Sequence, residues 1–360
     1  MEVTANQGGV EIKRPEPGWI GEALGTTIQA MEIMPMGPAR GFQSTTWKLQ
    51  LTCDPPGSAP ETVILKSETT NEEFNELTRL ANSYVREVGV YKHLIPRLNN
   101  HQPVVYACDA SQPCWLLIED LTHLRPGDQV VGLTRQETLG AVQRMAGLHA
   151  EFWMDPHLEG QDWLPAHNFW FAQPNTELVE PFFQNYGVRL GESVSKICRA
   201  VVEQGEAINA AISERPWTLI HGDLRADNLL FGGPSESPAA TILDWSWASR
   251  SMAAIDLAFL IGGSTPIPQR RGCLDELLVT WHDELVSQGV RDYPLADARR
   301  DLQLASLRAL TTSIVVSNFD QKLDINIRSS LLWDQAIQRH GAFAEELEAW
   351  EALPDPSMFS

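Results

Sequence analysis

Three oxygen-bearing side chains, Asp223, Asn228 and Asp244, have a spacing that suits phosphoryl transfer. The run LIHGDLRADNLLF spans 219–231, so the aspartate and the asparagine lie five residues apart in a tight loop after an apolar strand. Apolar runs at 229–231 and 241–243 flank a Gly-Gly-Pro turn and predict a hairpin that brings Asn228 and Asp244 to adjacent ends. Asp223 would orient and deprotonate an incoming hydroxyl, while Asn228 and Asp244 would hold Mg²⁺ on the phosphates.

The alternative is that His221-Gly222-Asp223 is an ordinary turn and Asp244 a carboxylate at a strand end. The full pattern H-x-D-x-x-x-x-N, followed by a short hairpin and a further aspartate, is far more specific than H-x-D alone. His221 could act as an acid or base, but we favour a packed residue that fixes the loop. Whether Arg225 neutralises transferred charge stays open.

Periodicity predicts the elements that must position these residues. Alternation at 46–51 and the apolar run 62–66 predict a hairpin around the turn Asp54-Pro55-Pro56-Gly57. A helical pattern follows from Glu72 to about Arg97, with Asn71 as N-cap, and strand-like runs lie at 103–108 and 115–118. Beyond about Thr134 the chain is mainly helical, apart from a β-like stretch at 217–245.

This order predicts a loose arm at 1–18, a small β-rich lobe at 19–120 with one major helix, and a larger, mainly helical lobe at 121–360. The fold class is α+β.

The chain resembles the aminoglycoside phosphotransferase and choline kinase superfamily, within the protein-kinase-like bilobal fold. The resemblance covers roughly Gly21–Ile261 and is greatest to the ecdysteroid-kinase-like (CHK-kinase-like) branch. It rests on the H-G-D-x-x-x-x-N loop, on GLHAEFW at 147–153 and on DLAFL at 256–260. It implies a catalytic role for Asp223 and metal binding by Asn228 and Asp244. Asp256 would hydrogen-bond the catalytic loop.

The same resemblance implies an ATP site built largely on the first lobe. Lys66, at the end of VILK, matches the lysine that contacts the α- and β-phosphates, and Glu87 matches its glutamate partner. Each could instead be a solvated side chain. The stretch 37–46, with Gly41, Ser44 and Thr45, resembles the phosphate-covering loop but lacks G-x-G-x-x-G. The run 116–121 resembles the hinge strand, where the main chain of Glu119 and Leu121 would bind adenine.

Other classes fit less well. Asp244-Trp245-Ser246 lacks the glycine of D-F-G, and neither an A-P-E segment nor an activation loop is evident, which disfavours a protein kinase. The sequence has no G-x-x-x-x-G-K-[ST] motif of a P-loop NTPase. A nucleotide-binding pseudokinase with a regulatory role is the remaining alternative, although every catalytic position is filled.

The charge and cysteine content of the chain limit the partners and the cellular compartment that we expect. The net charge of −20 would repel nucleic-acid phosphates and anionic lipid, so we expect neither as a partner. The five cysteines include no C-x-x-C pair, which argues against a zinc site and favours reduced thiols in the cytoplasm. The first residues contain no apolar core, so we expect no secretory signal. No run of about 18 apolar residues occurs, so we expect no membrane-spanning segment.

The acceptor is predicted to be a small molecule with a hydroxyl group, bound in the larger lobe. An aminoglycoside, a choline-like amine, a sterol or another metabolite stays open, as do ATP against GTP and the oligomeric state. Candidate walls are aromatic, although for any single tryptophan we favour core packing. They are His149, Trp153, Trp163, His167, Trp170, Trp245 and Trp247.

Overall fold

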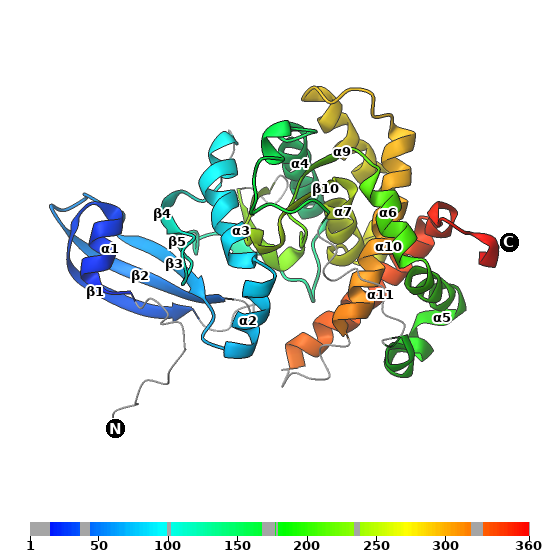
Figure 1. Ribbon diagram of the computed structural model, residues 1–360, viewed down its shortest axis with the longest axis horizontal. Helices are drawn as coiled ribbons and strands as arrows, with labels where there is room; N and C mark the ends of the chain where they lie inside the picture. Colours follow the sequence, from blue (N-terminus) through cyan, green and yellow to red (C-terminus); the bar gives the residue numbers. More distant parts are fainter. Residues whose placement is uncertain are drawn as a thin grey trace. The chain divides into compact units, whose positions relative to one another are not determined.

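The structure is a computed structural model, and it describes residues 15–36, 44–98, 102–167, 177, 179–233, 238–317 and 327–359. The chain divides into two compact units, Met1–His123 and Leu124–Ser360. Figure 1 shows the helices and strands of each unit in sequence colours.

The first unit is built on one antiparallel sheet with the strand order β1-β2-β3-β5-β4. The hairpin predicted from 46–51 and 62–66 is confirmed as β2 paired with β3, with Thr46 opposite Lys66. The strand runs predicted at 103–108 and 115–118 are confirmed as β4 and β5. The elements are α1 (Pro17–Leu24), β1 (Thr27–Met36), β2 (Ser44–Asp54), β3 (Thr62–Glu68), α2 (Glu72–Leu80), α3 (Ser83–Gly89), a π-helix (Val90–Leu94), a 3₁₀ turn (Ile95–Arg97), β4 (Val105–Asp109) and β5 (Trp115–Glu119).

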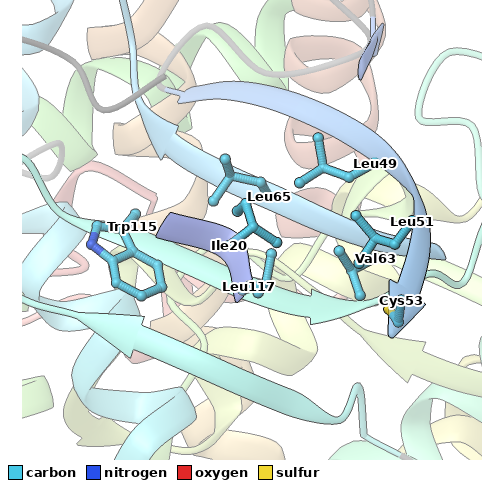
Figure 2. Packing of buried hydrophobic residues seen from close by; sticks show 8 residues of the cluster. All are labelled: Ile20, Leu49, Leu51, Cys53, Val63, Leu65, Trp115 and Leu117. Atoms are coloured by element: carbon cyan, nitrogen blue, oxygen red, sulfur yellow. The ribbon is translucent and has the colours of Figure 1, made fainter. Parts of the chain in front are cut away.

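The two faces of this sheet have different partners. Side chains alternate along a strand, so Val63 and Leu65 of β3 point to one face and Lys66 to the other. On the first face α1 places Ile20 among apolar side chains of β2, β3 and β5, as Figure 2 shows. Trp19 of α1 also meets Trp115 edge to face, with ring centroids 5.0 Å apart. The apolar packing therefore fixes which face of β3 presents Lys66.

The single helix predicted from Glu72 to about Arg97 is wrong in one respect, because it is broken into α2 and α3. Asn82, between them, has φ 55°, which is the left-handed region that asparagine tolerates better than most residues. The break changes the register of the helical pattern, and the buried residues of α3 include Glu87. Periodicity extended across a short break cannot reveal such a change.

The second unit is mainly helical, with short strands near the predicted loop. Its helices are α4 (Arg135–Glu151), α5 (Val179–Glu203), α6 (Gly205–Ser213), α7 (Ala254–Leu257), α8 (Ile267–Arg271), α9 (Leu274–Ser287), α10 (Leu295–Ser317) and α11 (Ile327–Glu346). A π-helical turn covers Ala258–Gly263, and 3₁₀ turns cover Pro156–Leu158, Ala226–Asn228, Trp245–Trp247, Ala349–Ala352 and Ser357–Phe359. The strands are β6 (Arg125–Pro126), β7 (Trp217–Ile220), β8 (Leu229–Gly232), β9 (Ala239–Ile242) and β10 (Ser249–Met252).

The predicted hairpin between 229–231 and 241–243 is confirmed as β8 paired with β9, with Leu229 opposite Ile242. β7, which leads into the predicted catalytic loop, pairs with β10. The buried helix α10 contacts α5, α6, α7, α9 and α11, and so forms the centre of the helical core. In the described part of the chain, no helix has the length and apolar character needed to cross a membrane.

Candidate active site

The loop that follows β7 turns sharply at Gly222. This residue has φ 81°, and an added Cβ would lie 2.3 Å from the Trp247 carbonyl oxygen. Both the backbone conformation and the close approach therefore require glycine. Asp223 comes directly after this turn, and its carbonyl accepts hydrogen bonds from Arg225 N at 2.9 Å and Asn228 Nδ2 at 2.8 Å. The predicted motif thus folds into a compact loop closed by its own polar groups.

His221 fixes this loop through both nitrogens of its ring. Its Nδ1 accepts the Asp223 N–H at 3.2 Å, so its Nε2 must carry the proton that is donated to the Leu243 carbonyl at 2.8 Å. The ring also packs against the fully buried Trp245, with centroids 4.9 Å apart. With both nitrogens engaged, His221 acts as a brace, which fits the packing alternative better than an acid or base role.

Asp256 anchors the same loop from α7. Its carboxylate accepts hydrogen bonds from His221 N at 2.7 Å, Gly222 N at 2.9 Å and His149 Nε2 at 3.2 Å, and its side chain is fully buried. The Trp281 indole N–H donates to His149 Nδ1 at 3.2 Å. Since an indole nitrogen can only donate, His149 must carry its proton on Nε2 and donate it to Asp256.

Asp223 and its neighbours form a linear ion-pair network. Arg225 donates from Nε to Asp223 Oδ2 and from Nη1 to Asp227 Oδ2, both at 3.0 Å. Burial by itself lowers the pKa of Arg225, but the two carboxylates and the nearby charge of Asp244 outweigh it and raise the pKa above its usual value. Asn228 Nδ2 also donates to Asp223 Oδ2 at 3.2 Å. These side-chain bonds all end on Oδ2, and the Asp223 side chain keeps 27% of its surface exposed.

Asn228 and Asp244 are brought together by the β8–β9 hairpin. Leu243 N donates to the Asn228 carbonyl at 2.9 Å, so the chain reaches Asp244 directly beside the loop. Asp244 has φ 66°, a left-handed conformation at which an aspartate is tolerated. Asn228 must present Nδ2 to Asp223, because both of its partners there are oxygen atoms that accept hydrogen bonds. Its Oδ1 is therefore the amide atom that could bind a cation. Within the described ranges, no group of at least three His, Cys, Asp or Glu side chains is placed to hold a metal ion.

In the first unit, Lys66 and Glu87 form the predicted ion pair. Lys66 Nζ lies 2.7 Å from Glu87 Oε1, and the side chains are 16% and 4% exposed. Tyr84, one turn earlier on α3, accepts the Thr69 N–H at 2.9 Å and so joins α3 to the chain just after β3. Burial raises the pKa of Tyr84 to about 12. A small pocket beside the pair is also lined by Tyr84, Val88 and Leu116.

The other residues predicted to bind nucleotide have varied surroundings. Gly41 lies outside the described residues, while Ser44 and Thr45 begin β2 and pair with Glu68 and Ser67 of β3. The Glu119 N–H donates to the Val104 carbonyl at 2.8 Å, so of its main-chain groups only the carbonyl could contact adenine. The Asp120 side chain, between Glu119 and Leu121, accepts the Thr122 N–H at 2.9 Å.

The aromatic residues considered as walls for an acceptor separate into two groups. His149 and Trp245 are fully buried in the contacts described above, and for Trp245 this agrees with the core packing that we favour for any single tryptophan. Trp153, Trp163, His167 and Trp247 are partly exposed, and Trp170 lies outside the described residues.

Sequence reasoning missed two residues that hold the loop from outside the motif. Gln129 N donates to Asp227 Oδ1 at 3.0 Å, and Ala226 N donates to Gln129 Oε1 at 2.8 Å and to Ser264 Oγ at 3.0 Å. Neither Gln129 nor Ser264 belongs to a motif, and no local pattern in the sequence could have identified them.

Comparison with known proteins gives the family and the fold. The model of the phosphotransferase enzyme family matches residues 59–297, which is more than half of the chain. A spectinomycin phosphotransferase solved with ADP and spectinomycin is similar at 13% identity and a TM-score of 0.56, over 94% of this chain and 100% of that chain. Choline kinase from Cryptosporidium parvum Iowa II is similar at 12% identity and a TM-score of 0.54, over 92% of this chain and 94% of that one. At such identities the likeness shows a shared kinase-like fold. A search of curated protein sequences found no match.

Proposed function

The chain belongs to the phosphotransferase enzyme family, and we propose that it transfers the γ-phosphoryl group of ATP to a hydroxyl group of a small molecule. In this reaction the acceptor oxygen forms a bond to phosphorus, the bond from phosphorus to the leaving ADP oxygen breaks, and the hydroxyl proton passes to Asp223. The observation that carries the proposal is the environment of Asp223. Arg225 and Asn228 hold one oxygen of its carboxylate, while 27% of the side-chain surface stays exposed.

Asp223 is suited to orient a hydroxyl because its neighbours engage Oδ2. Among the described residues, no hydrogen bond to Oδ1 accompanies those from Arg225 and Asn228, so Oδ1 is the oxygen we assign to the acceptor. The transition state of phosphoryl transfer is loose, so positioning matters more than strong basicity. A carboxylate held beside a guanidinium at 3.0 Å meets that need.

We assign the Mg²⁺ ligands to Asn228 Oδ1 and the Asp244 carboxylate. Both are hard oxygen donors of the kind Mg²⁺ prefers, and Mg²⁺ keeps several waters, so two protein ligands suffice. The fixed orientation of the Asn228 amide supports this assignment. Bound Mg²⁺ would supply positive charge to the phosphate oxygens. Arg225 contributes a further positive charge beside Asp223, and we assign it to neutralising the negative charge of the transferred phosphoryl group.

We assign nucleotide contacts in the first unit to Lys66, with Glu87 holding its ammonium group in place. A buried pair at 2.7 Å fixes a flexible lysine as a point charge, which is what a phosphate requires. Ser44 and Thr45, near this pair on the neighbouring strand, are assigned to the phosphates as well. The Glu119 carbonyl and the Leu121 main chain are assigned to adenine.

Two finer assignments rest on the sequence. We place the chain in the ecdysteroid-kinase-like branch because of the segments at 147–153 and 256–260. We also propose a cytoplasmic location. All five cysteines are free thiols, which supports this proposal.

The test is transfer of ³²P from [γ-³²P]ATP with Mg²⁺ to a library of hydroxyl-bearing metabolites, including aminoglycosides, choline and sterols. Asp223→Ala should reduce transfer by roughly 10²- to 10⁴-fold, as for loss of a general base, while ATP with Mg²⁺ still raises the melting temperature. Asp283→Ala is the matched control, because its carboxylate is 74% exposed on α9.

Full transfer by Asp223→Ala would remove Asp223 from the mechanism. Nucleotide binding by the wild-type protein without transfer to any acceptor would favour the regulatory alternative instead.

A further inference from the structure

A chain of direct hydrogen bonds connects α11, near the end of the second unit, to the loop that carries Asp223. It begins at Arg339, which is only 4% exposed. Its Nη1 donates to the Gln129 carbonyl at 2.7 Å and to the Gly263 carbonyl at 3.2 Å, and its Nη2 donates to the Val130 carbonyl at 2.9 Å. One guanidinium group therefore fixes the turn at 128–131 and the end of the π-helical turn together.

Gln129 connects this turn to the loop through its main-chain N–H and its side-chain oxygen, and every polar group it has is bonded. Its N–H binds Asp227 Oδ1, its Oε1 accepts Ala226 N and the Ser264 hydroxyl, and its Nε2 donates to the Gly263 carbonyl at 2.9 Å. Gln129 is 4% exposed, so water cannot readily replace a bond that is lost here.

The remaining steps lead from Asp227 to Asp223. The Asp227 side chain is fully buried, and the oxygen not bound by Gln129 accepts Arg225 Nη1 at 3.0 Å. Arg225 Nε in turn donates to Asp223 Oδ2 at 3.0 Å. Gly127, directly before this turn, also touches the loop, since an added Cβ there would lie 2.3 Å from the Ala226 carbonyl oxygen. The turn cannot shift without moving the loop.

We infer that Arg339 is a positioning residue for phosphoryl transfer, acting through Gln129, Asp227 and Arg225 to set the orientation of the Asp223 carboxylate. This inference rests on the proposed function for its effect on catalysis, but the hydrogen-bond chain itself can be tested without activity. Burial lowers the pKa of Arg339 to about 10, so its guanidinium stays charged at neutral pH and its bonds to the carbonyls are charge-assisted.

The neighbouring contacts show that Arg339 is not needed merely to hold α11 in place. Arg270 of α8 already holds α11 by donating to Glu346 Oε2 at 2.7 Å, and it also donates to the Gly262 carbonyl at 2.9 Å. Arg271 adds a bond to Glu346 Oε1 at 2.9 Å. Helix α11 thus stays attached without Arg339, whereas the 128–131 turn loses its bonds to α11.

The experiment compares Arg339→Met, Arg339→Lys and the control Arg271→Met, which removes an arginine bonded to the same helix but is 61% exposed. We expect Arg339→Met to lower kcat by roughly 10- to 100-fold, as for a small misplacement of a catalytic group. The KM for ATP should stay within about twofold, because the change removes an interaction needed in the transition state and not in binding. Arg339→Lys should recover part of kcat, since one ammonium group cannot reach every carbonyl.

Hydrogen–deuterium exchange gives the readout that is independent of turnover. Arg339→Met should accelerate exchange in peptides covering 127–132 and 221–231, and Arg271→Met should leave both unchanged. If Arg339→Met lowers only the melting temperature and exchange in 221–231 stays as in the wild type, the inference is wrong. If the wild-type protein transfers no phosphoryl group, the proposed function fails, while the exchange result still decides whether Arg339 positions the loop.

A second variant guards against a misfolded Arg339→Met protein. Ser264→Ala removes a fully buried hydroxyl that bonds both Ala226 N and Gln129 Oε1. We expect faster exchange of the Ala226 amide and a smaller loss of kcat than for Arg339→Met. Unchanged exchange at Ala226 would contradict the chain of bonds at its central step.

Discussion

Replacing Asp256 by asparagine tests the brace that holds the candidate catalytic loop. The carboxylate accepts three N–H groups, on Oδ1 from Gly222 and on Oδ2 from His221 and His149. An amide of the same shape keeps one acceptor oxygen and turns the other acceptor into a donor. In its better orientation it keeps the bonds to His221 and His149, and its NH₂ group then faces the Gly222 N–H.

His149 cannot relieve this conflict by moving its proton to the other nitrogen. Its Nδ1 already accepts the Trp281 indole N–H, so Nε2 must remain a donor. The alternative orientation of the amide would oppose two donors instead of one. The protein therefore loses at least one bond and cannot recover it by switching tautomers.

The magnitude follows from these bonds. Losing one charge-assisted hydrogen bond costs about 1.5–3 kcal/mol, and the two that remain weaken because their acceptor is neutral. A neutral amide is easier to bury than a carboxylate, which offsets part of this cost. We expect Asp256→Asn to lower the free energy of unfolding by about 3 kcal/mol and the melting temperature by roughly 6–12 °C for a unit of this size.

The assay is urea unfolding followed by tryptophan fluorescence, with transfer activity measured well below the melting temperature. Asp275→Asn is the control, because this carboxylate is 80% exposed beside Arg299 and should change stability by less than about 0.5 kcal/mol. Since Gly222 and Asp223 are neighbours, activity per folded molecule should also fall in Asp256→Asn. Equal stability of the two variants would refute the conclusion that the Asp256 carboxylate holds the candidate catalytic loop.

Two further predictions concern the nucleotide site and pH. Lys66→Met should raise the KM for ATP by about tenfold or more and reduce the rise in melting temperature caused by ATP with Mg²⁺. Lys92→Met, at an exposed lysine of the same unit, should change neither quantity. Equal effects of the two substitutions would exclude a special role for Lys66 in binding ATP. Burial, with Arg270 and Arg339 adding to it, lowers the pKa of His340 to about 3. Below about pH 6.5 the unfolded chain then binds the extra proton, so stability should fall by up to about 2 kcal/mol from pH 6.5 to 5, and His340→Gln should flatten this slope while exposed His123→Gln does not. A slope unchanged in His340→Gln would show that other groups cause it.

Local patterns predicted much of the fold. The alternation of β2 and β3 and the turn between them are encoded in adjacent residues, and the apolar runs flanking Gly232-Gly233 gave the β8–β9 hairpin. The break at Asn82 and the short helix α1 were missed. Short elements of this kind carry too few residues for a period to be recognised.

The sequence by itself determined which residues make up the candidate catalytic loop and the hairpin that follows it. Asp223, Asn228 and Asp244 lie within one hairpin and its preceding loop, so their spacing alone brings them together. Only the tertiary structure decided what holds them there. Gln129 meets Asp227 across 98 residues of chain, and Arg339 meets Gln129 across 210. Hydrogen bonds between buried polar groups so far apart in the chain leave no periodic trace in the sequence.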